Sequence, residues 1–159
     1  MTKTQITAEP GMPLVTMTRD FGAPPELVFR AYTEPTLVVQ WLGPRDLTMK
    51  VEHWEVRDGG RWRYAHTDAQ GETYWFHGVF HGTPSPAAIV QTFEFEGAAG
   101  HVCLETTTLE RRGDKTLVRT VSAFSSVEDR DAMIAGGMEV GVRDSDQRLA
   151  ELLARLQAG

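Results

Sequence analysis

The chain has 159 residues, of which 41% are hydrophobic and 24% are charged, and its formal net charge is −6. This length and composition are typical of one globular domain with a single hydrophobic core. The acidic balance argues against nucleic acid and against an anionic membrane surface as partners, and without a run of about 18 apolar residues we expect no membrane span.

Residues 1–13 form the first segment, which is polar and contains two prolines. We expect a flexible arm there, followed by one domain over residues 14–157. The segment has no apolar core of the kind that a secretory signal peptide needs. Cys103 is the only cysteine in the sequence, so neither an internal disulfide nor a cysteine-based zinc site can form. Together these features favour a protein of the reducing cytoplasm.

A first strand and two short helices are predicted next. Residues 14–21 alternate apolar and polar side chains, which is the period of a strand with one buried face. Pro24 and Pro25 suit the first turn of a helix, where a missing N–H leaves no hydrogen bond unmade. Pro35 ends that helix and begins a second short one, which Gly43 closes.

Alternation with period two continues over most of the chain that follows. Short clusters rich in Gly, Pro, Asp and Ser divide this region into six predicted strands. They cover residues 46–56, 60–67, 72–82, 88–96, 101–111 and 115–124. Because every connection is short, neighbouring strands are expected to run antiparallel.

A long amphipathic helix is predicted at the end of the chain. Ser126 and Asp129 form a capping box for a short helix, and Gly136 and Gly137 separate this helix from the longer one. The longer helix carries one stripe of residues at spacings of three and four, which predicts its buried face. The stripe consists of Met138, Val142, Ser145, Leu149, Leu152 and Leu156. Asp144 and Asp146 fall on the polar face and are expected to be solvated.

The predicted fold class is α+β. A strongly curved antiparallel sheet of about seven strands would wrap around the long C-terminal helix, with the two short helices placed after the first strand. This arrangement is the simplest one that buries the stripe of the long helix. Any gap between sheet and helix would then form an apolar cavity.

Several stretches of the chain, taken in order, carry a resemblance to a known family. They are FGAPPELVFRAYTEP, QWLGP, EVRDGGRWRY, FHGVF, PSPAAIVQTF and GGMEVGVRDSDQRLAELLARL. Together they resemble the SRPBCC superfamily, and within it the group related to the C-terminal domain of the activator of the heat-shock chaperone ATPase. The resemblance covers residues 14–157 and implies the START-like, or helix-grip, fold. The chain departs from its relatives at Leu42 and Val142, where they commonly have aromatic side chains.

The motif WFHGVFHG contains two histidines, His77 and His81, four residues apart. In a strand four residues span roughly 13 Å. A zinc ion needs its ligand nitrogens at about 2 Å, so these histidines do not form a metal site by themselves. Alternation points both of them outward and directs Phe76 and Phe80 toward the long helix. Gly78 lies between these two rings and leaves room either for close packing or for a ligand.

The same alternation assigns His53 and His66 to the inner face of the sheet. Each of them either contacts a ligand or is a core histidine that is bonded to a neighbour. Trp54, Trp75 and Val79 fall on the outer face. Large apolar side chains exposed on adjacent strands predict a homodimer interface there.

Most of the large aromatic side chains fall on inner faces. They either fill the core or line a cavity for an apolar ligand, with a few polar side chains as anchors. The residues predicted to line such a cavity are Trp41, His53, Trp62, Tyr64, His66, Phe76, Phe80, Phe93, Thr120, Met138 and Val142.

Three functions are consistent with these features. The first is binding of a small hydrophobic or amphipathic molecule between sheet and helix. The second is an enzyme of the cyclase, dehydratase or hydrolase type acting on a ring-shaped substrate, as relatives with the helix-grip fold imply, with His53, Tyr64 and His66 as the titratable candidates. The third is the family's role as an interaction module that activates a chaperone ATPase. The sequence has no GxSxG, HExxH, P-loop or GxGxxG motif, so we predict no catalytic residue, metal or cofactor.

Overall fold

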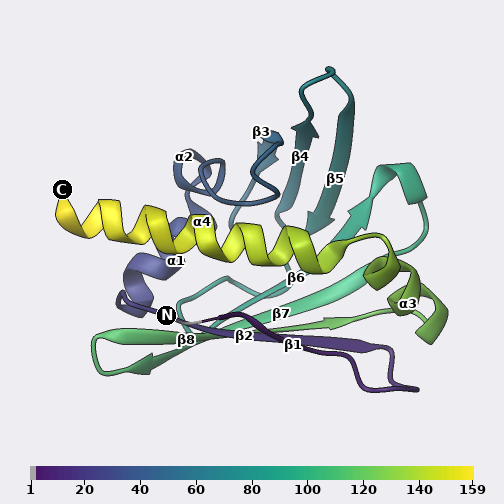
Figure 1. Cartoon of the computed structure of the whole chain (residues 1–159). Helices are drawn as coiled ribbons and strands as arrows, with labels where there is room; N and C mark the ends of the chain where they lie inside the picture. Colours follow the sequence, from purple (N-terminus) through teal and green to yellow (C-terminus); the bar gives the residue numbers. More distant parts are fainter. Residues whose placement is uncertain (1–2) are drawn as a thin grey trace.

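An antiparallel sheet curves around one long helix in the computed structural model, which describes residues 3–159 (Figure 1). The strands are β1 (Gln5–Thr7), β2 (Leu14–Phe21), β3 (Thr48–Trp54), β4 (Arg61–Thr67), β5 (Thr73–Val79), β6 (Ala88–Phe95), β7 (Cys103–Arg112) and β8 (Lys115–Ala123). The helices are α1 (Pro25–Thr33), α2 (Pro35–Val38), the short 3-10 helix η1 (Glu96–Ala98), α3 (Val127–Ala135) and α4 (Met138–Ala158). Across the sheet the strand order is β1-β2-β8-β7-β6-β5-β4-β3.

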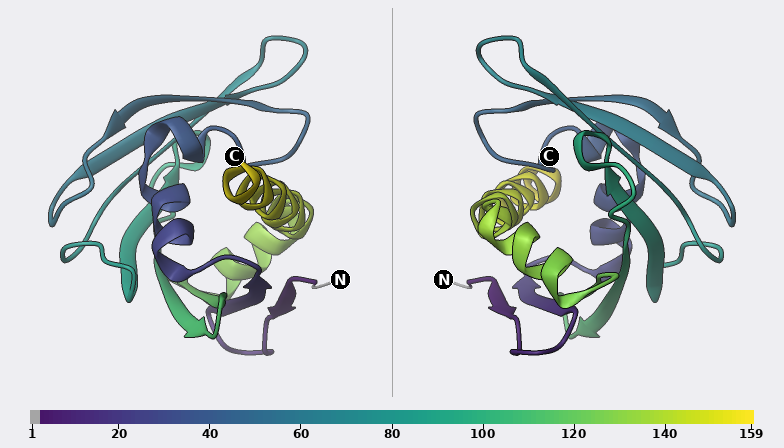
Figure 2. Two further views of the ribbon diagram at one scale, coloured as in Figure 1. Left: turned by 90° about the vertical axis from the view of Figure 1, so that its left-hand side faces the viewer. Right: turned by 90° about the vertical axis from the view of Figure 1, so that its right-hand side faces the viewer.

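The predicted architecture of a curved sheet around a long C-terminal helix is confirmed. Figure 2 shows α4 nearly end-on, with the sheet bending around it and α1 beside it. The sheet has eight strands, whereas we predicted about seven, because the segment expected to be a flexible arm contains β1. This strand pairs with β2, and Gln5 lies opposite Thr18. With only three residues, β1 is too short for alternation to reveal it.

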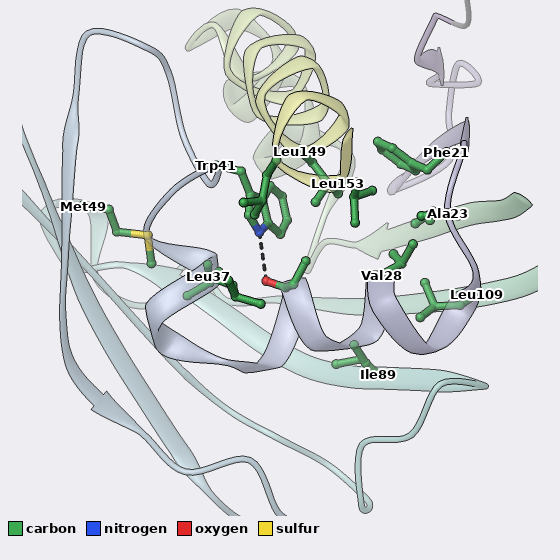
Figure 3. Close-up of a cluster of buried hydrophobic side chains, with 14 of the residues drawn as sticks. Phe21, Ala23, Val28, Leu37, Trp41, Met49, Ile89, Leu109, Leu149 and Leu153 are labelled. Carbon is green, nitrogen blue, oxygen red and sulfur yellow. Dashed lines mark hydrogen bonds between the residues drawn. The ribbon is translucent and has the colours of Figure 1, made fainter. Parts of the chain in front are cut away.

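The hydrophobic core lies toward the C-terminal half of α4. Leu149, Leu152 and Leu153 are buried there against α1, α2 and the sheet (Figure 3). The Trp41 indole Nε1 donates a hydrogen bond to the carbonyl of Ala31 at 2.9 Å, which ties the segment after α2 to α1. The N-terminal half of α4 has only Ser145 among its buried residues. The helix is therefore held firmly at one end and leaves space beneath the other.

The connection between α3 and α4 follows the sequence prediction. The Ser126 side chain accepts a hydrogen bond from the backbone N–H of Asp129 at 3.0 Å, as a capping residue does. Gly137 has a φ of 91°, a left-handed conformation that favours glycine, and it separates the two helices. Within residues 3–159, none of the helices is both long enough and apolar enough to cross a membrane.

A β-bulge in β3 makes the predicted directions of His53 and Trp54 wrong. Val51 lies opposite Tyr64, but the next paired residue is His53, opposite Arg63, so one extra residue enters β3. From that point on, the side chains face the opposite way. The His53 ring is on the outer face, with its Nε2 2.9 Å from an Arg61 guanidinium nitrogen.

Trp54, which was predicted to face outward, points into the molecule. Its indole Nε1 donates to the carbonyl of Thr33 at 2.7 Å. The outer face keeps Trp75 and Val79, and the Arg63 guanidinium lies 3.8 Å from the centroid of the Trp75 ring. A homodimer through this face stays a prediction. Of the three residues on which it was based, Trp75 and Val79 still face outward and Trp54 does not.

Replacing Trp75 with aspartate tests that prediction. If the outer face joins two copies, light scattering of the wild-type protein gives the mass of a dimer, and Trp75→Asp gives the mass of a monomer because a charge is placed in an apolar contact. Arg119→Gln, an exposed change elsewhere on the sheet, is the control and should leave the mass unchanged. A monomer for the wild-type protein would contradict the prediction.

Candidate functional site

A cavity of about 780 Å³ lies between the inner face of the sheet and the N-terminal half of α4. All strands from β2 to β8 contribute to its wall, and Met138, Gly141 and Val142 of α4 cover it. The volume is within the range of roughly 300–1,000 Å³ that is usual for small-molecule sites. The cavity thus occupies the space that the packed end of α4 leaves open.

Most of the residues predicted to line a cavity do line it. These are Trp41, Trp62, Tyr64, His66, Phe76, Phe93, Thr120, Met138 and Val142. His53 is not among them, because the bulge in β3 turns it outward. Phe80 is not among them either, since it is 2% exposed and packs edge-on against Trp54 in the core, with ring centroids 6.2 Å apart. Trp54 lines the cavity instead.

Aromatic rings form a continuous series along one wall. The Tyr64 ring lies between those of Trp62 and Phe76, at centroid distances of 5.3 and 5.2 Å, and Phe76 continues to Phe93 at 5.4 Å. Trp62 and Tyr64 are buried, whereas Phe76 and Phe93 are only half-buried although they line the cavity inside the fold. All four rings border the cavity, and they differ in that two are also buried in the core and two are half-buried.

Gly78 leaves room for the Trp62 ring rather than for a ligand. A Cβ at this position would lie 2.6 Å from Trp62 Cζ2 and 2.0 Å from the carbonyl oxygen of Thr92. Strand β6 and the indole therefore approach the backbone of β5 more closely than any other residue type allows. This glycine sets the position of the aromatic wall.

His66 is tied to the chain segment that follows α2. Its Nε2 is 3.2 Å from the carbonyl oxygen of Leu42, so this nitrogen carries the proton that is shared in the bond. Burial lowers the pKa of the imidazole, which keeps the ring neutral at pH 7. A Cβ at Gly43 would lie 2.5 Å from the same Nε2. These contacts match the alternative of a core histidine bonded to its neighbours, although the ring also borders the cavity.

Helix α4 is fastened to the same segment. The backbone N–H of Gly43 donates to Ser145 Oγ at 2.7 Å, and a guanidinium nitrogen of Arg148 donates to the carbonyl of Gly43 at 2.9 Å. Ser145 is the polar member of the buried stripe, and this bond accounts for its burial. The cover of the cavity is therefore fixed to the wall at this point.

Glu105 brings a carboxyl group to the cavity that sequence reasoning missed. It lies on the inner face of β7, between Gln91 of β6 and Ser122 of β8. The carboxylate accepts a long hydrogen bond from Ser122 Oγ, at 3.4 Å. Burial raises its pKa to about 7. The missed signal was alternation, because Glu105 shares its face with Cys103 and Leu109, which are buried.

Arg19 and Asp146 also line the cavity. Arg19 is on the inner face of β2 and is 9% exposed. Asp146 was expected to be solvated, and this expectation is wrong, because the N-terminal segment covers that side of α4. The Thr4 hydroxyl donates to Asp146 Oδ2 at 2.5 Å, and burial raises the pKa of the carboxyl.

The described residues give no support for a cysteine nucleophile or for a metal site. Cys103 is buried, and burial raises the pKa of its thiol, which disfavours the thiolate that nucleophilic chemistry requires. Among residues 3–159 there is also no group of three or more His, Cys, Asp or Glu side chains that could hold a metal ion.

The cavity wall reaches exposed residues near the junction of α3 and α4. Gly136 and Gly137 are exposed there, as is His101 in the connection between β6 and β7. Figure 1 shows this connection and α3 at the same end of the molecule. His101 Nδ1 lies 2.9 Å from Asp129 Oδ1 of α3, so one side-chain contact joins the two segments at this end of the cavity.

The sequence matches one family model over residues 22–154. The model is that of the activator of Hsp90 ATPase homolog 1-like proteins. No curated protein matches the sequence.

Solved structures share the fold, which confirms the predicted class. A protein from Rhodobacter sphaeroides is 26% identical, with a TM-score of 0.88 over 96% of this chain and 99% of that protein. A protein from Staphylococcus epidermidis is 26% identical, with a TM-score of 0.80 over 94% of each chain. DynU16, a protein of the dynemicin biosynthetic locus, is 19% identical, with a TM-score of 0.64 over 89% of this chain and 47% of its own, and shows likeness of fold alone.

Proposed function

The chain belongs to the family of activator of Hsp90 ATPase homolog 1-like proteins, and from this premise we propose that it binds a small hydrophobic or amphipathic molecule between the sheet and α4. Family membership supports a site of this kind but does not identify its ligand, because one fold serves many functions. The proposal therefore depends on the wall of the cavity.

One observation carries the proposal. Phe76 and Phe93 expose apolar ring surface inside the fold, toward a cavity of about 780 Å³. Apolar surface that leaves water gains about 25 cal/mol per Å². A flat apolar molecule that covers these rings would gain this free energy without any rearrangement of the wall.

Polar side chains set among the apolar ones support an amphipathic ligand. Tyr64, Gln91 and Thr120 border the cavity with groups that donate and accept hydrogen bonds. Thr120 Oγ1 lies 3.0 Å from Thr107 Oγ1. This bond uses either the hydroxyl proton or one lone pair of Thr120, so the hydroxyl can form a further hydrogen bond with a ligand. An apolar wall with a few polar groups is the usual composition of a small-molecule site.

Native mass spectrometry of protein purified under mild conditions tests this proposal. We expect a species heavier than the polypeptide by the mass of one small molecule, and we expect the extra mass to disappear from the same sample after denaturation. The denatured sample is the control for covalent modification. Only the polypeptide mass under native conditions, at several stages of purification, would contradict the proposal.

A second function, proton-transfer catalysis in the same cavity, is favoured by Glu105. A carboxyl group with a pKa of about 7 exists in both protonation states near neutral pH, so it can take a proton from a substrate or give one. Of the residues first considered for this role, His53 lies outside the cavity and His66 uses Nε2 in a bond to the backbone. Tyr64 lines the cavity with Glu105.

A simple ring-opening reaction tests whether Glu105 can act as a base. In 5-nitrobenzisoxazole, loss of the ring C–H proton to a base breaks the N–O bond and gives a nitrile and a phenolate. If Glu105 takes this proton, the wild-type rate should rise with pH, with an inflection near 7, and Glu105→Gln should lack this rise. Equal rates for the two proteins at every pH would exclude this role of Glu105.

A further inference from the structure

Arg19 is a cation that is buried at the wall of the cavity. The residue is 9% exposed and lines the cavity from the inner face of β2. Among the described residues, its Nε has no hydrogen-bond partner, and its guanidinium carbon lies 5.0 Å from the centroid of the Phe21 ring. A guanidinium has five N–H donors and stays charged, so its burial is costly unless acceptors are supplied.

The carboxylates that face the cavity do not supply these acceptors. Asp146 is close enough to interact electrostatically with Arg19, but no ion pair joins the two within residues 3–159. Asp146 instead accepts a hydrogen bond from Thr4, and its pKa is raised, because burial outweighs the attraction of Arg19 and Arg143. Glu105 lies on β7, which is separated from β2 by β8.

We propose that the cavity takes an amphipathic ligand with an anionic oxygen group, such as a carboxylate, and that Arg19 binds this group. The inference rests on the proposed binding function and adds the chemical class of the ligand. A guanidinium matches such a group with two parallel N–H···O bonds, and these bonds are strong because both partners are charged. Binding an anion would supply an acceptor for Arg19 Nε, which has none among residues 3–159.

The position of Arg19 also gives the ligand an orientation. Arg19 is on β2, whereas the aromatic series begins with Trp62 and Tyr64 on β4, and four strands separate β2 from β4 in the sheet. Because the sheet is curved, these two parts lie on different sides of α4, as the purple and blue strands of Figure 2 show. The anionic group would face β2, and the flat apolar body would lie toward the rings of β4 to β6.

A pair of matched probes tests the inference. N-phenyl-1-naphthylamine is neutral, and 1-anilinonaphthalene-8-sulfonate has the same rings with one added sulfonate. We expect the wild-type protein to bind both and to prefer the sulfonate. In Arg19→Gln, binding of the sulfonate should weaken roughly 10-fold or more, the usual loss for a hydrogen bond to a charged group, while binding of the neutral probe should change less than about twofold.

Two further variants control for folding and for charge. Arg119→Gln removes an exposed arginine of the same sheet and should leave both affinities unchanged. Arg19→Lys keeps the buried charge and should retain part of the preference for the sulfonate. This variant keeps the test valid if Arg19→Gln lowers the stability of the fold. If Arg19→Gln weakens both probes equally, or if the wild-type protein has no preference, the anion site is wrong while the cavity function stands. If neither probe binds to the wild-type protein, the proposed function itself fails.

Discussion

Glu105→Gln is expected to stabilise the protein at pH 8 by about 2–3 kcal/mol and to have little effect at pH 4.5. The reason is the carboxyl pKa, which folding raises from its ordinary value of 4.5 to about 7. Each unit of pKa difference corresponds to about 1.4 kcal/mol. The expected stabilisation is smaller than the whole pKa difference would give, because part of the carboxyl surface faces the cavity rather than packed atoms.

The direction of the pH effect follows from proton binding. Between pH 4.5 and about 7 the folded state holds more protons at Glu105 than the unfolded state does. Stability from this group is therefore complete below the unfolded pKa and is lost as the pH rises through the folded pKa. Glutamine has no carboxyl to ionise, so the variant should not show this loss.

Urea unfolding of both proteins at pH 4.5, 6 and 8 measures the effect. Glu110→Gln, which removes an exposed carboxylate of the same strand, is the matched control and should show a much smaller change. A difference between wild type and Glu105→Gln that is the same at all three pH values would contradict the account. It would mean that Glu105 is well solvated and that the cavity around it is polar.

Gly78→Ala is expected to destabilise the protein by about 3 kcal/mol or more. The new Cβ would lie 2.0 Å from the carbonyl oxygen of Thr92 and 2.6 Å from the Trp62 ring, and it cannot be accommodated by side-chain rotation alone. Either β5 and β6 separate at this point or the strand bends, and overpacking of this kind costs several kcal/mol when backbone atoms are involved.

Thermal and urea unfolding of Gly78→Ala measure this loss. Gly22→Ala is the control, because a Cβ at Gly22 meets no atom within 4 Å and the backbone there is not left-handed. That variant should be close to wild type in stability. Equal stability of all three proteins would show that the indole of Trp62 does not lie against β5.

Alternation in the sequence predicts much of the cavity wall because the sheet has one buried face. Phe76 faces inward and His77 faces outward, where its ring bonds to Glu96, as the period of two requires. The same rule gives the wrong directions for His53 and Trp54, since one extra residue in β3 reverses the alternation. A bulge depends on hydrogen bonding with the neighbouring strand, and the local sequence contains no clear sign of it.

The charged residues of the cavity were missed for a different reason. Arg19 shares its strand face with Val15 and Phe21, so alternation alone would direct it inward. Burial of an unpaired charge is unfavourable, and sequence reasoning therefore assigns charged residues to the surface. Arg19 and Glu105 are exceptions to this rule, and such exceptions are concentrated at functional sites, where binding is gained at the expense of stability.

The central claim is that the space between the sheet and α4 binds a ligand, and a cavity-filling substitution tests it most directly. Thr120 points into the cavity, whereas Thr108 of the neighbouring strand is exposed. Titration with N-phenyl-1-naphthylamine should show that wild type and Thr108→Phe bind with equal affinity and that Thr120→Phe, although folded, binds at least roughly 10-fold more weakly, because its ring occupies the site. Equal binding by all three folded proteins, or no binding by the wild type, would contradict the claim.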